Sequence, residues 1–208
     1  MQVSKIEEFS ASKSKIIFED NSFIIVYKND IRRYGFAEGV EVSDKQLEVL
    51  YGEILPYRAK ARCMKLLQSR DYAEGELRKK LRGDGYPQTV IDATVEYLME
   101  YGYINDSRYI KLYYQCKSVK KSRKQIILDL QQKGISKESI MNVMGELYID
   151  SETNGDVQCI RKLLRKRKYK DSCADIKEKD KTKAYLFRKG FELDDIIKCM
   201  HHFNWENM

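Results

Sequence analysis

The sequence repeats a pattern of two helices joined by a tight turn, and a glycine marks each turn, at Gly85, Gly134 and Gly190. When these glycines are placed in register, residues on one face of the flanking helices also align, with the spacings of three and four that mark a helical face. The aligned sets are Leu77, Ile126 and Thr182; Leu81, Leu130 and Leu186; Tyr86, Ile135 and Phe191; Ile91, Ile140 and Ile196; Val95, Met144 and Met200; and Leu98, Leu147 and Phe203. The pattern predicts a repeat protein built from stacked helical modules.

The glycines have one physical role that fits all three positions. Each follows the last turn of a helix, where a residue in the left-handed conformation closes the helix, and glycine adopts that conformation without a Cβ clash. The next helix begins two residues later, at Pro87, Ser136 and Glu192. Pro87 has a fixed φ, Ser136 can cap the helix with its side chain, and Glu192 is a carboxylate suited to the positive end of a helix dipole. We therefore expect positive φ at the repeat glycines.

The spacing between the glycines indicates the size of each module. The intervals are 49 and 56 residues, which is room for three helices, and we expect the first helix of each module at residues 57–69, 106–117 and 157–168. The longer interval places an insertion in the loop YKDSCADIKEK of the third module. The expected fold is mainly α, with three tandem three-helix repeats at residues 56–104, 105–149 and 150–208 in an elongated curved array. Leu81, Leu130 and Leu186 should each be buried.

Residues 1–55 do not show the helical repeat pattern. The run KIIFEDNSFIIVY predicts two short strands around Asp20 and Asn21, because both residues tolerate the backbone angles of a hairpin turn. A lone hairpin is marginal in water, so we expect it to pack on the segments that follow. These are DIRRYGF and a helix capped near Ser43 that runs through Leu47 and Leu50. The sequence thus predicts an N-terminal segment of a β-hairpin plus a helix.

Composition argues against several functional classes. With 34% charged and 42% apolar residues and no stretch near the roughly 20 apolar residues that cross a bilayer, we expect a folded cytoplasmic protein without a membrane segment. The five cysteines are scattered and His201 and His202 are adjacent, which predicts neither a metal site nor another cofactor. Gly83-Asp84-Gly85 lacks the ending of a phosphate-binding loop, and no nucleophile and base occur at interpretable spacing. We therefore expect no enzymatic activity.

The charge of the chain is concentrated in the repeats. Residues 1–56 contain seven Lys and Arg against ten Asp and Glu, whereas residues 57–208 contain 32 against 22. Two segments are densest, residues 117–124 with five basic residues and residues 161–170 with seven and no acid. Such clusters suit a polyanion or an acidic protein face, although a solvated helix face explains them equally simply. The candidate contact residues are Lys120, Lys121, Arg123, Lys124, Arg161, Lys162, Arg165, Lys166 and Lys168.

Tyrosines gather where the first two repeats meet. The group comprises Tyr97, Tyr101, Tyr103, Tyr109, Tyr113 and Tyr114. Stacking on nucleic-acid bases is one interpretation of such rings. The more economical one is that they fill the seam between neighbouring modules and keep their hydroxyls at its wet edge.

Four stretches together resemble the RecX family, the bacterial regulators of the RecA recombinase. They are LLQSRDYAEGELRKKLRGDGY, LMEYGYINDSRYIKLYYQ, KSRKQIILDLQQKGIS and KRKYKDSCADIKEKDKTKAYLFRKGFELDDI, and the resemblance covers about residues 57–203. It implies three three-helix repeats that bind along the groove of the RecA filament on DNA and limit filament extension, ATP hydrolysis and strand exchange. The sequence departs from the family pattern at Gly75, inside a helix, and at Gly83-Asp84, where a basic residue is more usual.

The implied partners are the RecA filament and, weakly and without sequence preference, single- or double-stranded DNA, with the protein itself a monomer. Two other interpretations stay open. Helices joined by a short glycine-containing turn, together with a net charge of +7, also fit a helix-turn-helix-like protein that acts directly on DNA. A helical scaffold for some other protein would share the repeats but have no effect on a recombinase.

Overall fold

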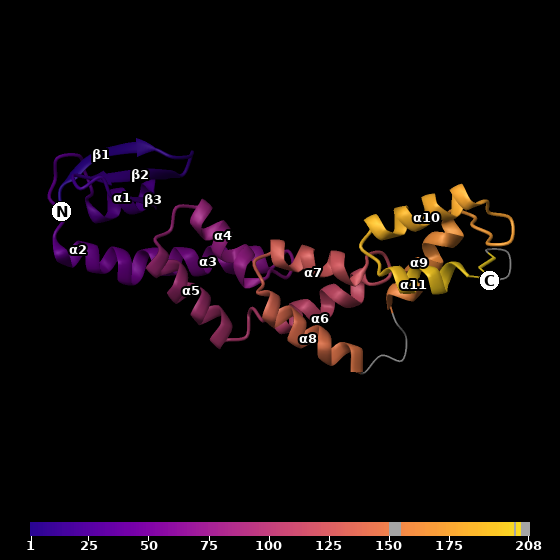
Figure 1. The fold of residues 1–208 in the computed structure, drawn as a ribbon. Coiled ribbons are helices and arrows are strands. Elements are labelled where there is room, and N and C mark those ends of the chain that lie inside the picture. Colours follow the sequence, from indigo (N-terminus) through magenta and orange to yellow (C-terminus); the bar gives the residue numbers. More distant parts are fainter. Residues whose placement is uncertain (150–154, 202, 205–208) are drawn as a thin grey trace. The chain divides into compact units, whose positions relative to one another are not determined.

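The structure is a computed structural model, which describes residues 1–149, 155–201 and 203–204 of the 208-residue chain. It is mainly helical, as predicted, with one small sheet near the N-terminus (Figure 1). The chain forms two compact units, Met1–Asn105 and Asp106–Met208. Within the described residues, no helix is both long and apolar enough to span a lipid bilayer.

The N-terminal sheet has three antiparallel strands in the order β1-β2-β3: β1 (Val3–Glu8), β2 (Lys13–Phe18) and β3 (Phe23–Tyr27). The predicted hairpin is confirmed in β2 and β3, and Asn21 in its turn has a φ of 62°. Strand β1, which the sequence did not predict, adds a third strand to this hairpin. Only Val3 of β1 is buried, so this edge strand has almost no apolar pattern in the sequence to reveal it.

Two short helices follow the sheet. Helix α1 (Lys28–Tyr34) ends at a glycine in the left-handed conformation. Helix α2 (Asp44–Val49) begins where the sequence predicted, since the Ser43 hydroxyl accepts the Gln46 N–H and the Gln46 side chain accepts the Ser43 N–H. This reciprocal capping box satisfies backbone donors that an α-helix otherwise leaves open.

Helix α2 continues without a break into a π-helical turn, η1 (Leu50–Ile54), and then into α3 (Leu55–Leu67). The reason is Pro56 in the first turn of α3. Proline has no N–H to donate to the preceding turn, and its ring crowds the carbonyl four residues earlier. A wider turn directly before it is the local distortion expected where a proline lies inside a long helix.

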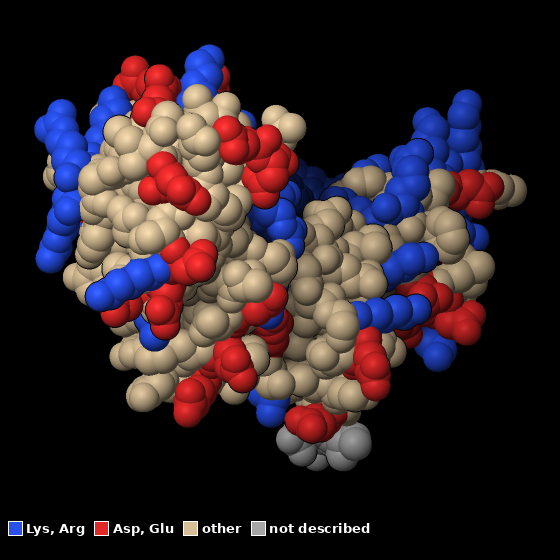
Figure 2. Space-filling model, turned by 90° about the vertical axis from the view of Figure 1, so that its left-hand side faces the viewer, with Lys and Arg blue, Asp and Glu red and all other residues tan. Residues whose placement is uncertain are grey.

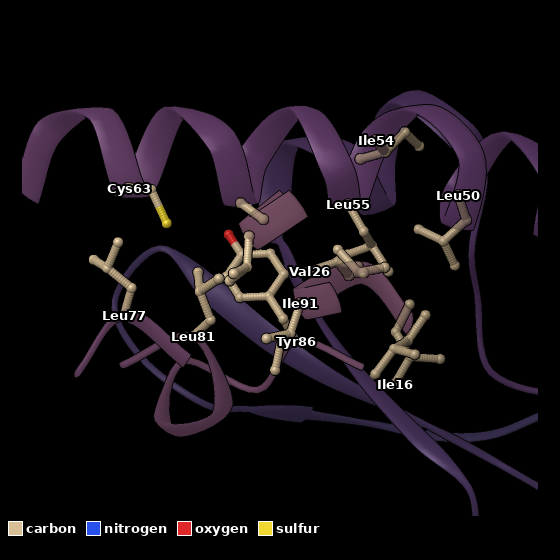
Figure 3. Close-up of a cluster of buried hydrophobic side chains, with 14 of the residues drawn as sticks. Ile16, Val26, Leu50, Ile54, Leu55, Cys63, Leu77, Leu81, Tyr86 and Ile91 are labelled. Carbon is tan, nitrogen blue, oxygen red and sulfur yellow. The ribbon is translucent and has the colours of Figure 1, made fainter. Parts of the chain in front are cut away.

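The first unit is completed by α4 (Glu74–Gly83) and α5 (Gln88–Glu100). Figure 3 shows side chains of α3, the sheet, α4 and α5 meeting in one apolar cluster. Its buried members include Ile16, Val26, Leu50, Leu55, Cys63, Leu77, Leu81, Tyr86 and Ile91. The sheet and the first group of three helices therefore share one core.

The described residues of the second unit form six helices. They are α6 (Asp106–Lys117), α7 (Arg123–Gln132), α8 (Lys137–Ile149), α9 (Gly155–Lys166), α10 (Ile176–Arg188) and α11 (Leu193–Met200). With α3, α4 and α5 of the first unit, they give the predicted three successive groups of three helices. The link between α9 and α10 is the longest within these groups, as the predicted insertion requires. The last four residues of the predicted loop, Ile176 to Lys179, instead belong to α10, so part of the extra length extends that helix. The division of the chain at residues 56, 105 and 150 stays a prediction, and residues 150–154 lie outside the described part.

The repeat register is confirmed in detail. Gly85, Gly134 and Gly190 have φ values of 83°, 89° and 84°. In each repeat, the N–H of the residue after the glycine donates to the carbonyl of the aligned leucine, which is the bond that closes a helix at such a glycine. Those leucines, Leu81, Leu130 and Leu186, have no exposed surface. Burial of aligned leucines explains why one periodicity recurs along the chain.

Two of the repeat glycines also lie close to an element from earlier in the chain, within their own unit. A Cβ on Gly85 would lie 2.9 Å from Cβ of Ile25 in β3 and closer still to the tip of that side chain. A Cβ on Gly190 would lie 2.9 Å from the Ser122 hydroxyl oxygen, at the start of α7. These glycines therefore permit close packing between modules as well as the turn itself.

Candidate polyanion-binding surface

The two units differ in charge. Met1–Asn105 contains 16 Lys and Arg against 17 Asp and Glu, a net charge of −1, and Asp106–Met208 contains 23 against 15, a net charge of +8. On the face of the molecule that Figure 2 shows, basic and acidic side chains are interspersed. Net charge alone therefore does not locate a binding surface. Whether the second unit has one depends on where its individual cations lie.

Four candidate residues lie at the start of α7, and we call Lys120, Lys121, Arg123 and Lys124 the α7 group. Lys120 and Lys124 are exposed, whereas Lys121 and Arg123 are partly buried. Lys121, just before the helix, places its Nζ 2.5 Å from Oδ2 of Asp129, which lies in the second turn of α7. Part of this group's charge is thus neutralised within the fold.

Asp129 is a local acceptor for three side chains. Besides Lys121, the Tyr113 hydroxyl donates to it at 3.0 Å and Gln125 Nε2 donates at 3.2 Å. Burial works to raise the pKa of Asp129, but the hydrogen bonds from Lys121, Gln125 and Tyr113 outweigh it and hold the pKa below its usual value. Lys121 therefore faces a carboxylate that stays ionised at neutral pH.

The third group of helices holds the N-terminus of α7. The Ser122 hydroxyl donates to the Lys189 carbonyl at 2.7 Å and accepts the Gln125 N–H, and the Arg123 N–H donates to Asp156 Oδ1 at 2.9 Å. Backbone donors in the first turn of a helix need such partners. These bonds fix the start of α7 against the end of α10 and the start of α9.

One cleft beside this contact has mixed charge. It encloses about 490 Å³ and is lined by Arg123, Lys124, Ile127, Leu128, Gln131, Lys137, Asp156, Gly190, Glu192 and Asp195. Burial is the main reason that the pKa of Asp156 is raised, and the nearby charges of Asp195 and Glu192 add to it. Three carboxylates in the lining repel a polyanion, so this cleft is a poor candidate for one.

A second cleft is basic. It encloses about 380 Å³ and is lined by Lys120, Lys121, Ser122, Gln125, Arg188, Lys189 and Phe191, with no carboxylate among these residues. We call it the basic cleft. Arg188 and Lys189, at the end of α10, were not among the predicted contact residues. The register placed Lys189 just before a repeat glycine, but nothing local in the sequence indicated that the end of α10 meets the start of α7.

The other five candidates form the α9 group: Arg161, Lys162, Arg165, Lys166 and Lys168. All five are exposed, and Cys159, Ile160 and Leu164 on the opposite face of α9 are buried. Lys168 follows the helix in the left-handed conformation, with a φ of 54°. None of the α9 group lines either cleft. The structure thus brings half of the α7 group together with Arg188 and Lys189, and not with the α9 group.

The tyrosine-rich segment divides between the two units. The Tyr97 ring lies 4.5 Å from that of Tyr101 and 6.5 Å from that of Tyr103, centre to centre, within the first unit. In the second unit the Tyr109 and Tyr113 rings stack at 6.1 Å. The idea that these rings fill a seam between repeats stays a prediction.

Metal and thiol chemistry find little support in the described part of the chain. There, no group of three or more His, Cys, Asp or Glu side chains could hold a metal ion. Cys63, Cys159 and Cys199 are buried thiols, and burial raises the pKa of Cys63 to about 11. A thiol with so high a pKa is a poor nucleophile at neutral pH.

Comparison with known proteins identifies the family. Two family models match, described as the first three-helix domain of RecX, at residues 59–98, and the third, at residues 155–200. The regulatory protein RecX of Caldanaerobacter subterraneus subsp. tengcongensis is 30% identical over 168 residues, which cover 80% of this chain and 81% of that protein. The regulatory protein RecX of Clostridium tetani is 26% identical over 208 residues, covering 96% of this chain and 93% of its own.

Solved structures agree in fold. A crystal structure of regulatory protein RecX has a TM-score of 0.61 at 20% identity and covers 96% of this chain and 98% of its own. That of RecX from Lactobacillus salivarius has a TM-score of 0.57 at 21% identity and covers 71% of this chain and 95% of its own. The repeat register, the fold and the relatives all lead to one conclusion: this chain belongs to the RecX family of regulatory proteins.

Proposed function

We propose that the chain is a non-enzymatic regulator of RecA, most simply a negative one, that binds along the RecA–DNA filament in the cytoplasm. In this role it limits filament extension, ATP hydrolysis and strand exchange. The observation that supports it best is the threefold repetition of one helical module, with aligned buried leucines and aligned turns. A filament offers the same surface once per protomer, so successive modules can each contact a successive protomer.

Repetition also explains how such a protein would distinguish a filament from free RecA. Linked modules raise each other's effective concentration, so weak contacts sum to tight binding on a polymer and remain weak on a single subunit. The protein would act as a monomer. The charge of the second unit suits the DNA inside the filament, or an acidic RecA surface, and predicts weak DNA binding without sequence preference.

Co-sedimentation tests this proposal. The protein should pellet with RecA filaments on single-stranded DNA, and far less with free RecA or with naked DNA. A helix-turn-helix-like regulator of DNA would instead bind naked DNA at specific sites and show base-specific protection. A scaffold for another protein would not pellet with RecA filaments and would have no effect on RecA.

A charge-reversal variant tests the α9 group. Arg161, Arg165 and Lys168 changed together to Glu should weaken inhibition of RecA ATPase, and the effect should shrink with salt because exposed charges are screened over about 10 Å at 0.1 M. Lys177, Lys181 and Lys198 changed to Glu are the matched control, since these residues are also exposed in the second unit. If the α9 variant melts normally and still inhibits like the parent at low and high salt, the α9 group is only a solvated face.

A further inference from the structure

We propose that the basic cleft binds backbone phosphates of a nucleic-acid strand, with Arg188, Lys189 and Lys120 as the principal donors. Arg188 and Lys189 stand at the end of α10 and Lys120 stands before the start of α7, so the cleft is formed by two helices from different repeats. The inference rests on the proposed function for its physiological ligand, which is the DNA held inside the filament.

The cleft is held in shape by bonds that do not use these cations. The Ser122 hydroxyl donates to the Lys189 carbonyl at 2.7 Å, so the backbone that bears Lys189 is tied to the cap of α7. Gly190, the next residue, allows this approach because a Cβ there would lie 2.9 Å from the same hydroxyl oxygen. Phe191 anchors the chain beyond it and is only 2% exposed. The donor positions therefore exist before any ligand binds, which lowers the entropic cost of binding.

The lining selects phosphate over other anionic surfaces. It offers four cations and the polar side chains of Ser122 and Gln125, and none of its residues is a carboxylate. Lys121 already contacts Asp129, so we assign it a minor role. An acidic protein partner would need apolar contact area at the centre of the interface, and the one apolar residue here, Phe191, is buried.

The same lining argues for contact with the nucleic-acid backbone and not with bases. A buried Phe191 cannot present its ring to a base, and single strands that are bound through their bases need accessible aromatic rings. Arginine and lysine side chains, by contrast, bind phosphate oxygens without reading sequence. We therefore expect binding that is insensitive to sequence and steeply dependent on salt.

Arg188 and Lys189 also suit the negative end of the α10 dipole, which is a purely structural role. The test must therefore separate binding from stability. The chain offers a matched pair of variants on α10 and its C-cap. One is Arg188→Gln with Lys189→Gln inside the cleft, and the other is Lys177→Gln with Lys181→Gln in the N-terminal half of the helix. Both remove two positive charges, and all four residues are exposed.

The experiment uses the full-length protein without RecA and a fluorescein-labelled oligothymidylate, with anisotropy measured over a salt series. The cleft variant should raise Kd at least about fivefold at low salt, and the slope of log K against log salt should become shallower by about 1.4, or 0.7 for each lost phosphate contact. The control should change Kd less than about twofold. Arg188→Lys with Lys189→Arg should retain binding, and a duplex and a mixed-sequence strand should follow the same order.

Equal losses in the cleft variant and the control would overturn the inference, because only total charge would then matter. Tight binding of polyglutamate through the same residues would overturn it in favour of an acidic protein partner. If the double variant does not fold, Lys120→Gln, which lies in a turn outside α10, gives the same test. If the cleft variant binds DNA like the parent, the inference of a phosphate site is wrong. The proposed function would still stand in that case, provided that the parent inhibits RecA.

Discussion

The residue before the repeat glycine is Asp84 in the first unit, but Lys133 and Lys189 in the second. Asp84 accepts a hydrogen bond from Arg62 Nε of α3 at 2.8 Å and lies 3.9 Å from Lys13 Nζ of β2. The hydrogen bond that Arg62 donates to Asp84 raises the pKa of Arg62. An acid at this position thus joins the sheet to α3, which gives Asp84 a structural role in the first unit.

In the second unit the same position faces different surroundings. Lys133 Nζ lies 5.7 Å from the ring centres of Tyr109 and Tyr113, and Lys189 lines the basic cleft. In the first unit, paired charges join separate elements: Asp84 contacts Lys13 of β2 and Arg62 of α3, and Arg58 of α3 contacts Asp30 of α1 at 2.9 Å. The second unit has no strand that would need such pairs within its described residues. One repeated position thus joins elements through an acid in the first unit and carries a cation in the second.

The largest effect is expected at the aligned buried leucines, which both units share. Leu81→Ala and Leu186→Ala should each lower the free energy of unfolding by about 2–5 kcal/mol, because both leucines are fully buried. Hydrogen exchange should show each loss mainly in the unit that holds the substitution. Leu128→Ala, at a leucine that is 45% exposed, is the control. A loss below about 1 kcal/mol at both buried sites in urea melts would contradict the common register.

The repeat glycine of the first unit should be the next most sensitive. Gly85→Ala and Gly102→Ala both place a Cβ on a residue with positive φ, but only Gly85 meets Ile25, whereas nothing lies within 4 Å at Gly102. The clash should make Gly85→Ala worse by about 1–3 kcal/mol in urea melts. Equal losses would mean that the turn conformation alone explains the glycine, and that the close approach to β3 is unimportant.

Exchanging the charges tests the comparison directly. Asp84→Lys puts a third cation beside Arg62 and Lys13 and should cost about 1–3 kcal/mol, a range discounted because these groups are partly exposed. Lys189→Asp, on an exposed side chain at the negative end of α10, should cost at most about 1 kcal/mol while weakening DNA binding. Thermal melts of both variants check this. A tolerated lysine at position 84 would show that charge is interchangeable at this position.

A fourth prediction concerns pH and Asp156. Because the pKa of Asp156 is raised in the folded state, ionisation costs stability as pH rises from the unfolded value, about 4, through the folded pKa. Asp156→Asn should remove this loss while its side-chain oxygen still accepts the Arg123 N–H. The variant should therefore match or exceed the parent at pH 7, and this advantage should vanish below pH 4. Asp156→Ala, which removes the cap, should cost about 1 kcal/mol; an advantage of Asn that persists in acid would rule out ionisation as its cause.

The smallest effect is expected at Lys168. Its φ of 54° suits glycine, so Lys168→Gly should be more stable than Lys168→Ala by up to about 1 kcal/mol. Both variants remove the same charge, which leaves backbone conformation as the difference between them. Chemical denaturation of the pair measures it. Equal stabilities would show that the turn after α9 relaxes around an alanine without strain.

Much of this molecule could be predicted from the sequence because its regularities are local. Helix periodicity identified the buried leucines, glycine chemistry predicted the positive φ at Gly134, and Ser43 marked the start of α2. Each depends on residues within about one turn of one another, where spacing and backbone sterics decide the outcome. The family resemblance added the order of the modules to these local signals.

Tertiary structure alone decided which distant residues meet. Strand β1 forms by pairing with β2, and its own residues show almost no apolar pattern. The basic cleft exists because the Ser122 hydroxyl of one repeat reaches the Lys189 carbonyl of the next, 67 positions away. The α9 group, the densest basic run in the sequence, lies apart from that cleft. Composition records how many cations a chain has, but only packing between repeats determines which of them face the same space.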